Sequence, residues 1–242
     1  EGLEPIDYGD DMLPEEDSAF LDGDFTETAD NYTELVLQEH PEFQDMFDRG
    51  EYLEQGINEF GYSGTCGETT QANTLNRLLE TNQFTENKVL REAVENGLCT
   101  VDHLDDAANG GTTTAQFMAL YDHMNKITGN KLDIECHEYE QALSVEEMAS
   151  ALDQGKVLNV AVDSSELWNV SRAPGDIYSD HWISVNSVER SIDGEITGFQ
   201  VVDSGGGVEF VDRDQFERCC FGTEKNGKVI DPTCIIISKK EA

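Results

Sequence analysis

The stretch SGTCGE at residues 63–68 is the most informative part of this chain. Thr65 and Glu68 have the spacing of a capping box, so we expect a helix to begin at Thr65. Apolar residues then recur at helical spacing, which predicts one buried face on a helix over residues 66–80. These apolar positions are Ala72, Leu75, Leu78 and Leu79.

Cys66 is the candidate nucleophile of this segment. It falls at the first helical position, where the positive end of the helix dipole favours a thiolate over a thiol. Gly64 and Gly67 flank the cysteine, and we expect them to leave room for a substrate backbone to approach the sulfur. A buried structural cysteine is the alternative, but the cap, the glycines and the partners described next favour catalysis.

His181 is the candidate base. It begins the stretch HWISVNSV, whose composition predicts a strand over residues 181–189. Trp182, directly after the base, is a candidate to shield it from water. The other histidines fit a site less well, because they lie in predicted loops, on polar helix faces or in an acidic leader. They are His40, His103, His123 and His137.

Asp203 is the candidate partner of His181. The dipeptide Asp193-Gly194 is a hairpin turn signal, and the return strand over residues 196–202 ends at Asp203. A turn centred there places Asp203 opposite Ser184, near the same end of the hairpin as His181. A carboxylate in that position fixes the tautomer of the imidazole and stabilises the imidazolium.

The remaining pattern predicts an α+β domain. Helical patterns come first, and antiparallel strand patterns dominate from residue 181 onward. The other expected helices cover residues 86–95 and 113–127, and a third is opened by a capping box of Ser144 and Glu147 and ended by Gly155. The expected strands cover residues 157–162, 181–189, 196–203, 207–211 and 234–238.

The charge balance limits the classes of partner. The chain has 51 acidic and 15 basic residues, and this net charge of −36 repels nucleic-acid backbones and anionic membranes. It favours a basic peptide or protein as partner, or a salty or extracellular setting. The sequence has no stretch of about 18 apolar residues, so we expect no membrane span.

We divide the chain into two parts after residue 50. Residues 1–50 hold 17 acidic residues and one basic residue, Arg49, by count from the sequence. Self-repulsion of this kind suits a solvated acidic leader, and a pro-segment that docks on the body is the alternative. Residues 51–242 have a globular pattern and form the expected catalytic domain.

The cysteines predict no metal site. None of the six cysteines forms a C-x-x-C pair, so we do not expect a structural zinc ion. If Cys66 stays a free thiol, an odd number of cysteines remains, which argues against a regular disulfide framework. The pairing of the other five is left open: Cys99, Cys136, Cys219, Cys220 and Cys234.

Four segments of the chain, in this order, resemble one known family. They are TCGETTQAN from residue 65, NGGTT from residue 109, DHWISVNSV from residue 180 and VVDSGG from residue 201. Together they are similar to the C39-like branch of papain-fold cysteine peptidases. The resemblance covers residues 51–238 and implies a papain-like fold, in which a nucleophile helix packs against an antiparallel β-sheet. It also implies a catalytic triad of Cys66, His181 and Asp203.

The resemblance further implies a glutamine whose amide helps to form the oxyanion hole. In such enzymes the glutamine lies a few residues before the cysteine, whereas here Gln55 lies eleven residues before Cys66, and Asn58 is nearer. We favour Gln55, which can reach the site if residues 61–64 form a bulging loop. The backbone N–H of Cys66 at the helix start would supply the second donor.

The expected reaction is acyl transfer at an amide, with hydrolysis of peptide bonds as the first choice. A thiolate and an imidazole suffice for it, so we expect no metal and no organic cofactor. A glutamine deamidase or transglutaminase would use the same three residues, and a binding or effector module could keep the fold without turnover. Substrate preference, oligomeric state and compartment stay open, with a secreted or cell-surface bacterial protein favoured over a cytoplasmic one.

Overall fold

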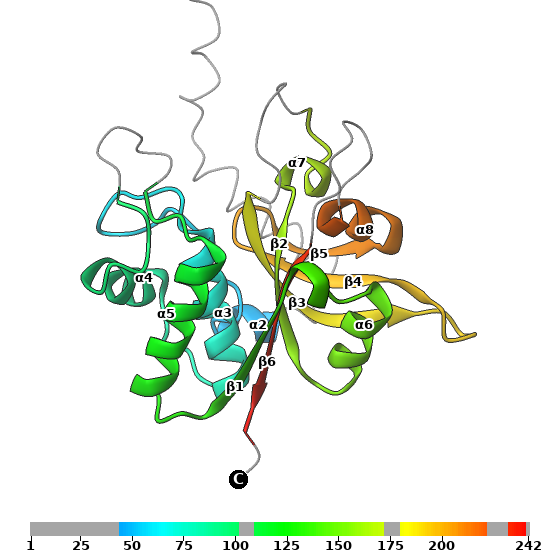
Figure 1. The fold of residues 1–242 in the computed structure, drawn as a ribbon, viewed down its shortest axis with the longest axis horizontal. Coiled ribbons are helices and arrows are strands. Elements are labelled where there is room, and N and C mark those ends of the chain that lie inside the picture. The colour runs from blue at the N-terminus through cyan, green and yellow to red at the C-terminus, as the bar shows by residue number, and fades with distance from the viewer. Residues whose placement is uncertain (1–43, 102–108, 172–179, 222–231, 241–242) are drawn as a thin grey trace, which may run out of the picture.

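The described part of the chain is built around a six-stranded antiparallel sheet with helices on both faces (Figure 1). The structure, a computed structural model, describes residues 44–101, 109–171, 180–221 and 232–240. The strand order is β1-β6-β2-β3-β4-β5. The strands are β1 (Leu132–His137), β2 (Val157–Val162), β3 (His181–Arg190), β4 (Ile196–Asp203), β5 (Gly207–Asp212) and β6 (Thr233–Lys239). The predicted mixture of helices and antiparallel strands is therefore confirmed.

The helices form one hydrophobic core on each face of the sheet. They are α2 (Gln44–Asp48), α3 (Cys66–Leu79), α4 (Glu86–Glu95), α5 (Thr114–Ile127), η4 (Tyr139–Gln141), α6 (Val145–Asp153), α7 (Ser164–Leu167) and α8 (Arg213–Phe221). Figure 1 shows α3, α4 and α5 on one side of the strands and α6 and α8 on the other. Successive side chains of a strand point to opposite faces, so Ile235 packs with Leu75 of α3, whereas Ile236 joins the core with Phe216 of α8.

The elements predicted from the sequence pattern are all present, with ends within two residues of the expected ones. Ser144 and Glu147 form the predicted capping box of α6. The pattern does not predict β1, α7 or α8. His137 is thus a strand residue and does not lie in a loop or on a helix. The short α7 and the largely polar α8 carry too few apolar positions for a periodic signal.

The start of α3 is where the sequence places it, but its cap is different. Thr65 is the N-cap residue and its side chain does not cap the helix, so the predicted capping box is wrong. The Thr65 hydroxyl donates to the Glu86 carboxylate over 2.5 Å, a charge-assisted bond that replaces the bond to the helix backbone.

Glu68 is fully buried, and its carboxyl oxygens have no hydrogen-bond partner among the described residues. Burial holds the pKa of Glu68 well above its usual range, which keeps the carboxylic acid neutral.

The β3–β4 hairpin differs from the predicted register by one residue. Ser184 lies opposite Val202 and not opposite Asp203, and a bulge at residues 185–187 shifts the pairing. Directly paired residues share a face, and successive residues alternate, so Asp203 points to the face opposite Ser184. His181, three residues before Ser184, points to that same face. The bulge thus places the imidazole and the carboxylate side by side.

Residues 44–50, which the sequence prediction assigns to the acidic leader, pack against the body of the protein. Met46 of α2 is buried against Val202 and Val208. The Asn76 amide of α3 donates to the Gly50 carbonyl over 2.8 Å. Residues 1–43 lie outside the described residues, so the leader stays a prediction there. No helix in the described ranges is long and apolar enough to cross a membrane.

Candidate active site

Cys66 lies at the start of α3, at the edge of a cavity of about 510 Å³. Only 8% of the residue is exposed, and it lines the cavity together with Gln55, His181 and Trp182. Because Cys66 is the first helical residue, its sulfur and its backbone N–H lie at the positive end of the α3 dipole. The arrangement stabilises negative charge on the sulfur and on a neighbouring oxygen.

His181 and Asp203 form a buried pair. The Nε2 atom of His181 is 2.6 Å from Oδ1 of Asp203, with 4% and 0% of the two side chains exposed. Nε2 donates to the carboxylate, which leaves Nδ1 for the Cys66 thiol, which lines the same cavity as His181. The structure therefore brings together the three residues that the sequence analysis singles out.

The protonation of the pair follows from its partners. Burial acts to lower the pKa of His181, but the hydrogen bonds and charges of Asp203 and Cys66 outweigh it and raise that pKa well above its usual range. Burial acts to raise the pKa of Asp203, but His181, Trp168 and the Gly205 N–H together hold that pKa below its usual range. A protonated imidazole in this position can donate a proton to a leaving group in the cavity.

Trp168, which lines the same cavity, completes the surroundings of Asp203, and the sequence pattern does not predict this contact. Its indole N–H donates to Oδ2 of Asp203 over 2.7 Å, and its ring centre lies 5.2 Å from that of His181. It follows directly on α7, a single helical turn with no sequence signal. Trp182, which the sequence suggested as the shield of His181, instead stacks on Phe117 with 4.1 Å between ring centres. The shielding prediction for Trp182 is thus wrong, and the tryptophan that covers the pair is Trp168.

The loop after Asp203 is shaped to fit the carboxylate. The Gly205 N–H donates to Oδ1 of Asp203 over 2.8 Å. A Cβ atom on Gly206 would lie 2.4 Å from Oδ2 of Asp203, closer than any ordinary contact. Glycine at position 206 therefore lets the backbone turn around the carboxylate.

Gln55, the candidate oxyanion donor, lies at the same cavity as Cys66. Its amide Nε2 donates to the Ser63 carbonyl over 3.2 Å, and its Oε1 accepts from the Ser204 hydroxyl over 2.8 Å. The second N–H of the amide remains for a ligand in the cavity. Asn58, the other candidate, is used inside its own loop, where it donates to the Tyr62 carbonyl over 2.6 Å.

The two glycines beside Cys66 have different surroundings. Gly64 lines the cavity, in agreement with the expectation that it leaves room for a substrate. Gly67 does not serve that purpose, because a Cβ atom there would lie 2.2 Å from the Thr112 hydroxyl and 3.2 Å from Phe117. Gly67 instead allows α3 to approach the segment that precedes α5.

The remaining cysteines and histidines of the described residues lie apart from this site. All six cysteines are free thiols. Burial raises the pKa of Cys99 and that of Cys219 to about 12, so neither thiol ionises at neutral pH. His123 contacts Glu92 over 2.7 Å, and His40 and His103 lie outside the described residues. Within the described ranges, no group of three or more His, Cys, Asp or Glu side chains could hold a metal ion.

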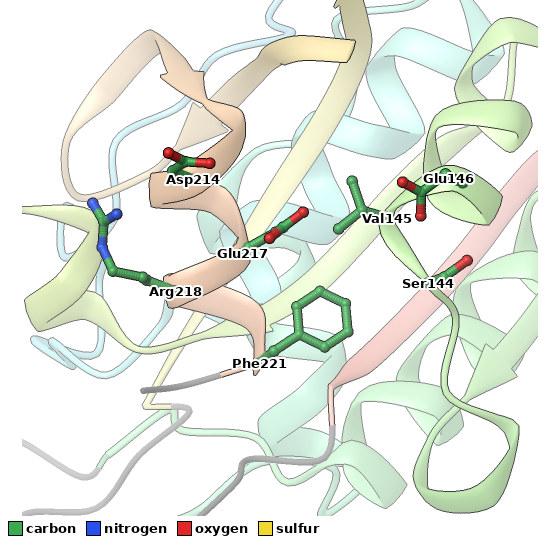
Figure 2. A pocket seen from close by; sticks show the side chains of 7 residues that line it. All are labelled: Ser144, Val145, Glu146, Asp214, Glu217, Arg218 and Phe221. Atoms are coloured by element: carbon green, nitrogen blue, oxygen red, sulfur yellow. The ribbon is translucent and has the colours of Figure 1, made fainter. Parts of the chain in front are cut away.

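A second hollow, of about 560 Å³, lies between the start of α6 and α8 (Figure 2). It is lined by Ser144, Val145, Glu146, Asp214, Glu217, Arg218 and Phe221. It shares no described lining residue with the cavity at Cys66, and none of these seven is a cysteine or a histidine. We assign no chemistry to it.

Comparison with known proteins gives a distant likeness. No family model and no curated protein matches the sequence. Among solved structures, the chain is similar to one described as a double glycine motif protease from an AMS/PCAT transporter in complex with the leader peptide. The identity is 11% and the TM-score 0.41, over 78% of this chain and 91% of that chain. A likeness at this level assigns neither family nor activity, so the function rests on the geometry around Cys66.

Proposed function

We propose that this protein is a cysteine peptidase-like hydrolase of papain-like fold, which cleaves peptide or amide bonds. The observation that carries the proposal is His181, which bonds the buried Asp203 carboxylate at 2.6 Å and lines one cavity with the Cys66 thiol at a helix N-terminus. This is the arrangement that activates a sulfur nucleophile, with the base in turn oriented by a third group. The open cavity beside the sulfur supplies a place for the acyl group.

In the proposed reaction the Cys66 thiolate attacks the carbonyl carbon of the substrate. The oxyanion that forms accepts hydrogen bonds from the Cys66 backbone N–H and from the Gln55 amide. Nδ1 of His181 then protonates the leaving amine, and a thioester to Cys66 remains. A water molecule, deprotonated by the same nitrogen, then attacks the thioester, which releases the acid and restores the Cys66 thiolate beside protonated His181. Asp203 keeps Nε2 protonated throughout.

A peptide or protein with basic side chains is the substrate class that we propose. The net charge of −36 attracts cationic chains. Deamidation or transfer at glutamine side chains uses the same nucleophile. Release of ammonia without chain cleavage would identify that activity instead.

The first test is alkylation of the thiol with iodoacetamide, measured as intact mass at neutral and mildly acidic pH. We expect rapid single labelling at mildly acidic pH in the native protein, and none in Cys66→Ala. His181→Ala keeps the thiol and is expected to react at least about tenfold more slowly. Slow labelling of the native protein, or equal labelling of Cys66→Ala, would contradict an activated Cys66.

The second test is hydrolysis of a peptide library rich in Lys and Arg, read by mass spectrometry. Native protein is expected to produce cleavage that Cys66→Ala does not. An acidic library of the same length serves as the control for charge preference. If the thiol is activated but no peptide is cleaved and no ammonia is released, the hydrolase proposal is wrong.

A further inference from the structure

Glu86 is a buried carboxylate that the reaction above does not use. It is the first residue of α4, and only 4% of it is exposed. A buried carboxylate is costly unless hydrogen bonds replace its water. The identity of its donors therefore shows what the side chain does in the protein.

Four donors converge on Glu86, and all of them come from one segment of the chain. Oε1 accepts from the Gly56 N–H over 2.7 Å, from the Asn58 amide over 2.9 Å and from the Thr65 hydroxyl over 2.5 Å. Oε2 accepts from the Ile57 N–H over 3.0 Å. These residues span the segment 56–65, which joins Gln55 to Cys66.

The contacts hold both ends of that segment. Gly56 and Ile57 directly follow Gln55, and Thr65 directly precedes Cys66. The Gly56 N–H also lies 3.2 Å from the Thr65 hydroxyl, so the two ends meet at the carboxylate. The far side of Gln55 is held by Ser204, which bonds both its backbone and its amide. One buried side chain thus sets the relative position of the Gln55 amide and the Cys66 N–H.

We infer that Glu86 is a positioning residue for the oxyanion hole formed by Gln55 and the Cys66 N–H. The inference rests on the proposed function, because it assigns a role within that site. Only a carboxylate can accept from all four donors, since a glutamine amide would turn its own N–H groups toward at least one of them. The carboxylate also lies at the positive end of α4, which favours its charge.

Two reagents separate the oxyanion hole from the activation of the thiol. Iodoacetamide reacts with the thiolate by displacement at a saturated carbon and forms no oxyanion. p-Nitrophenyl acetate acylates the sulfur through a tetrahedral oxyanion. Both rates are measured at Cys66 by intact mass, with Cys66→Ala as the blank. An oxyanion defect slows acylation alone.

The Glu86→Gln variant is expected to slow acylation by about 10- to 100-fold and to leave alkylation within about twofold of native. Gln55→Ala should show the same selective loss. If Glu86 acts through Gln55, the double variant should lose little more than either single variant.

Glu51→Gln is the matched control. Glu51 is also 4% exposed, but its side-chain contacts are Arg49 and Arg77, both outside the segment 56–65. The Glu51→Gln variant should therefore leave the ratio of the acylation rate to the alkylation rate unchanged. If Glu86→Gln does not fold, Thr65→Val decides, because it nearly keeps the side-chain shape but removes the hydroxyl that donates to Glu86 and accepts from Gly56. It should slow acylation several-fold and spare alkylation.

Three results would overturn the inference and can be told apart. If Glu86→Gln is acylated at the native rate, Glu86 does not position the oxyanion hole, and the proposed function still stands. The same holds for Thr65→Val if Glu86→Gln does not fold. Equal loss of both rates makes Glu86 a general structural residue. A native Cys66 that reacts with neither reagent ends the proposed function, and the inference with it.

Discussion

Among single residues, the His181–Asp203 pair has the clearest consequence for stability. The folded-state pKa of His181 is raised, so its contribution is fully present below its unfolded value of 6.5 and is lost as pH rises through the folded pKa. The folded-state pKa of Asp203 is lowered, so its contribution is present above its unfolded value of 3.8 and is lost as pH falls through the folded pKa.

We therefore expect the stabilisation by this pair to be largest near about pH 5 and to decline toward both extremes. The measurement is urea unfolding of the native protein and of Asp203→Asn near pH 3, 5 and 9. The difference in unfolding free energy should peak at the middle value. A difference that grows steadily toward high pH would show that His181 is neutral in the folded state.

Trp168 is the second residue whose role can be tested singly. Trp168→Phe keeps an aromatic ring but removes the N–H that donates to Asp203 over 2.7 Å. Since the residue is 42% exposed, we expect a loss of about 1 kcal/mol in unfolding free energy, below the roughly 1.5–3 kcal/mol that is usual for a bond to a charged group. Alkylation of Cys66 should slow modestly.

Trp182→Phe is the control for the loss of an indole N–H. Its N–H donates to the Thr112 carbonyl over 3.2 Å and does not touch Asp203. The pH dependence of Cys66 alkylation should therefore change in Trp168→Phe and stay as in the native protein in Trp182→Phe. Equal shifts in the two variants would contradict the assignment.

Among elements, the end of the β3–β4 hairpin and its glycine turn place the site. The bulge at residues 185–187 puts Asp203 on the face of His181, and the turn that follows wraps around the carboxylate. On the other side of the cavity, α3 presents Cys66 at its N-terminus and is tied to β3 by the bond from Thr70 to the Trp182 carbonyl, 3.0 Å long. The N-terminus of α3 and the end of the β3–β4 hairpin thus lie on two sides of one cavity.

The turn yields a prediction with a built-in control. Gly206→Ala places a Cβ atom 2.4 Å from Asp203 Oδ2, so either the carboxylate or the loop must move. We expect about 1–3 kcal/mol of destabilisation and at least about tenfold slower alkylation of Cys66. Gly205→Ala meets its nearest atom, on Trp168, at 3.2 Å and should cost far less. Urea unfolding and alkylation rates measure both, and equal effects would contradict the prediction.

For the whole molecule, charge is the dominant property. With a net charge of −36, carboxylates repel one another across the surface, and this repulsion opposes the compact state. Salt screens the repulsion between exposed charges that lie more than about 10 Å apart at 0.1 M ionic strength, and at shorter separations as the salt concentration rises. We expect the thermal midpoint to rise by several degrees between low salt and about 0.5 M sodium chloride. Differential scanning fluorimetry measures it, and a falling midpoint would mean that ion pairs outweigh the repulsion.

How much of the fold could be predicted depends on how local its causes are. The ends of α4 and β2 and the capping box of α6 follow from neighbouring residues, so the pattern alone predicts them. The short α7 and the polar α8 form because they pack against distant parts of the chain. Their sequences show no apolar periodicity, so the pattern does not predict them. The Ser184–Val202 pairing depends on a bulge that hairpin counting does not include.

The start of α3, the order of Cys66, His181 and Asp203 along the chain, and the mixture of helices and antiparallel strands could all be predicted from the sequence. These follow from periodicity, turn signals and chemical type, which act over a few residues. Two contacts could not be predicted in this way: Trp168 covers Asp203, and the Thr65 hydroxyl binds Glu86 instead of capping α3. Those contacts join residues 35 and 21 positions apart in the chain. Their free energy comes from burial and charge, which exist only once the chain has folded.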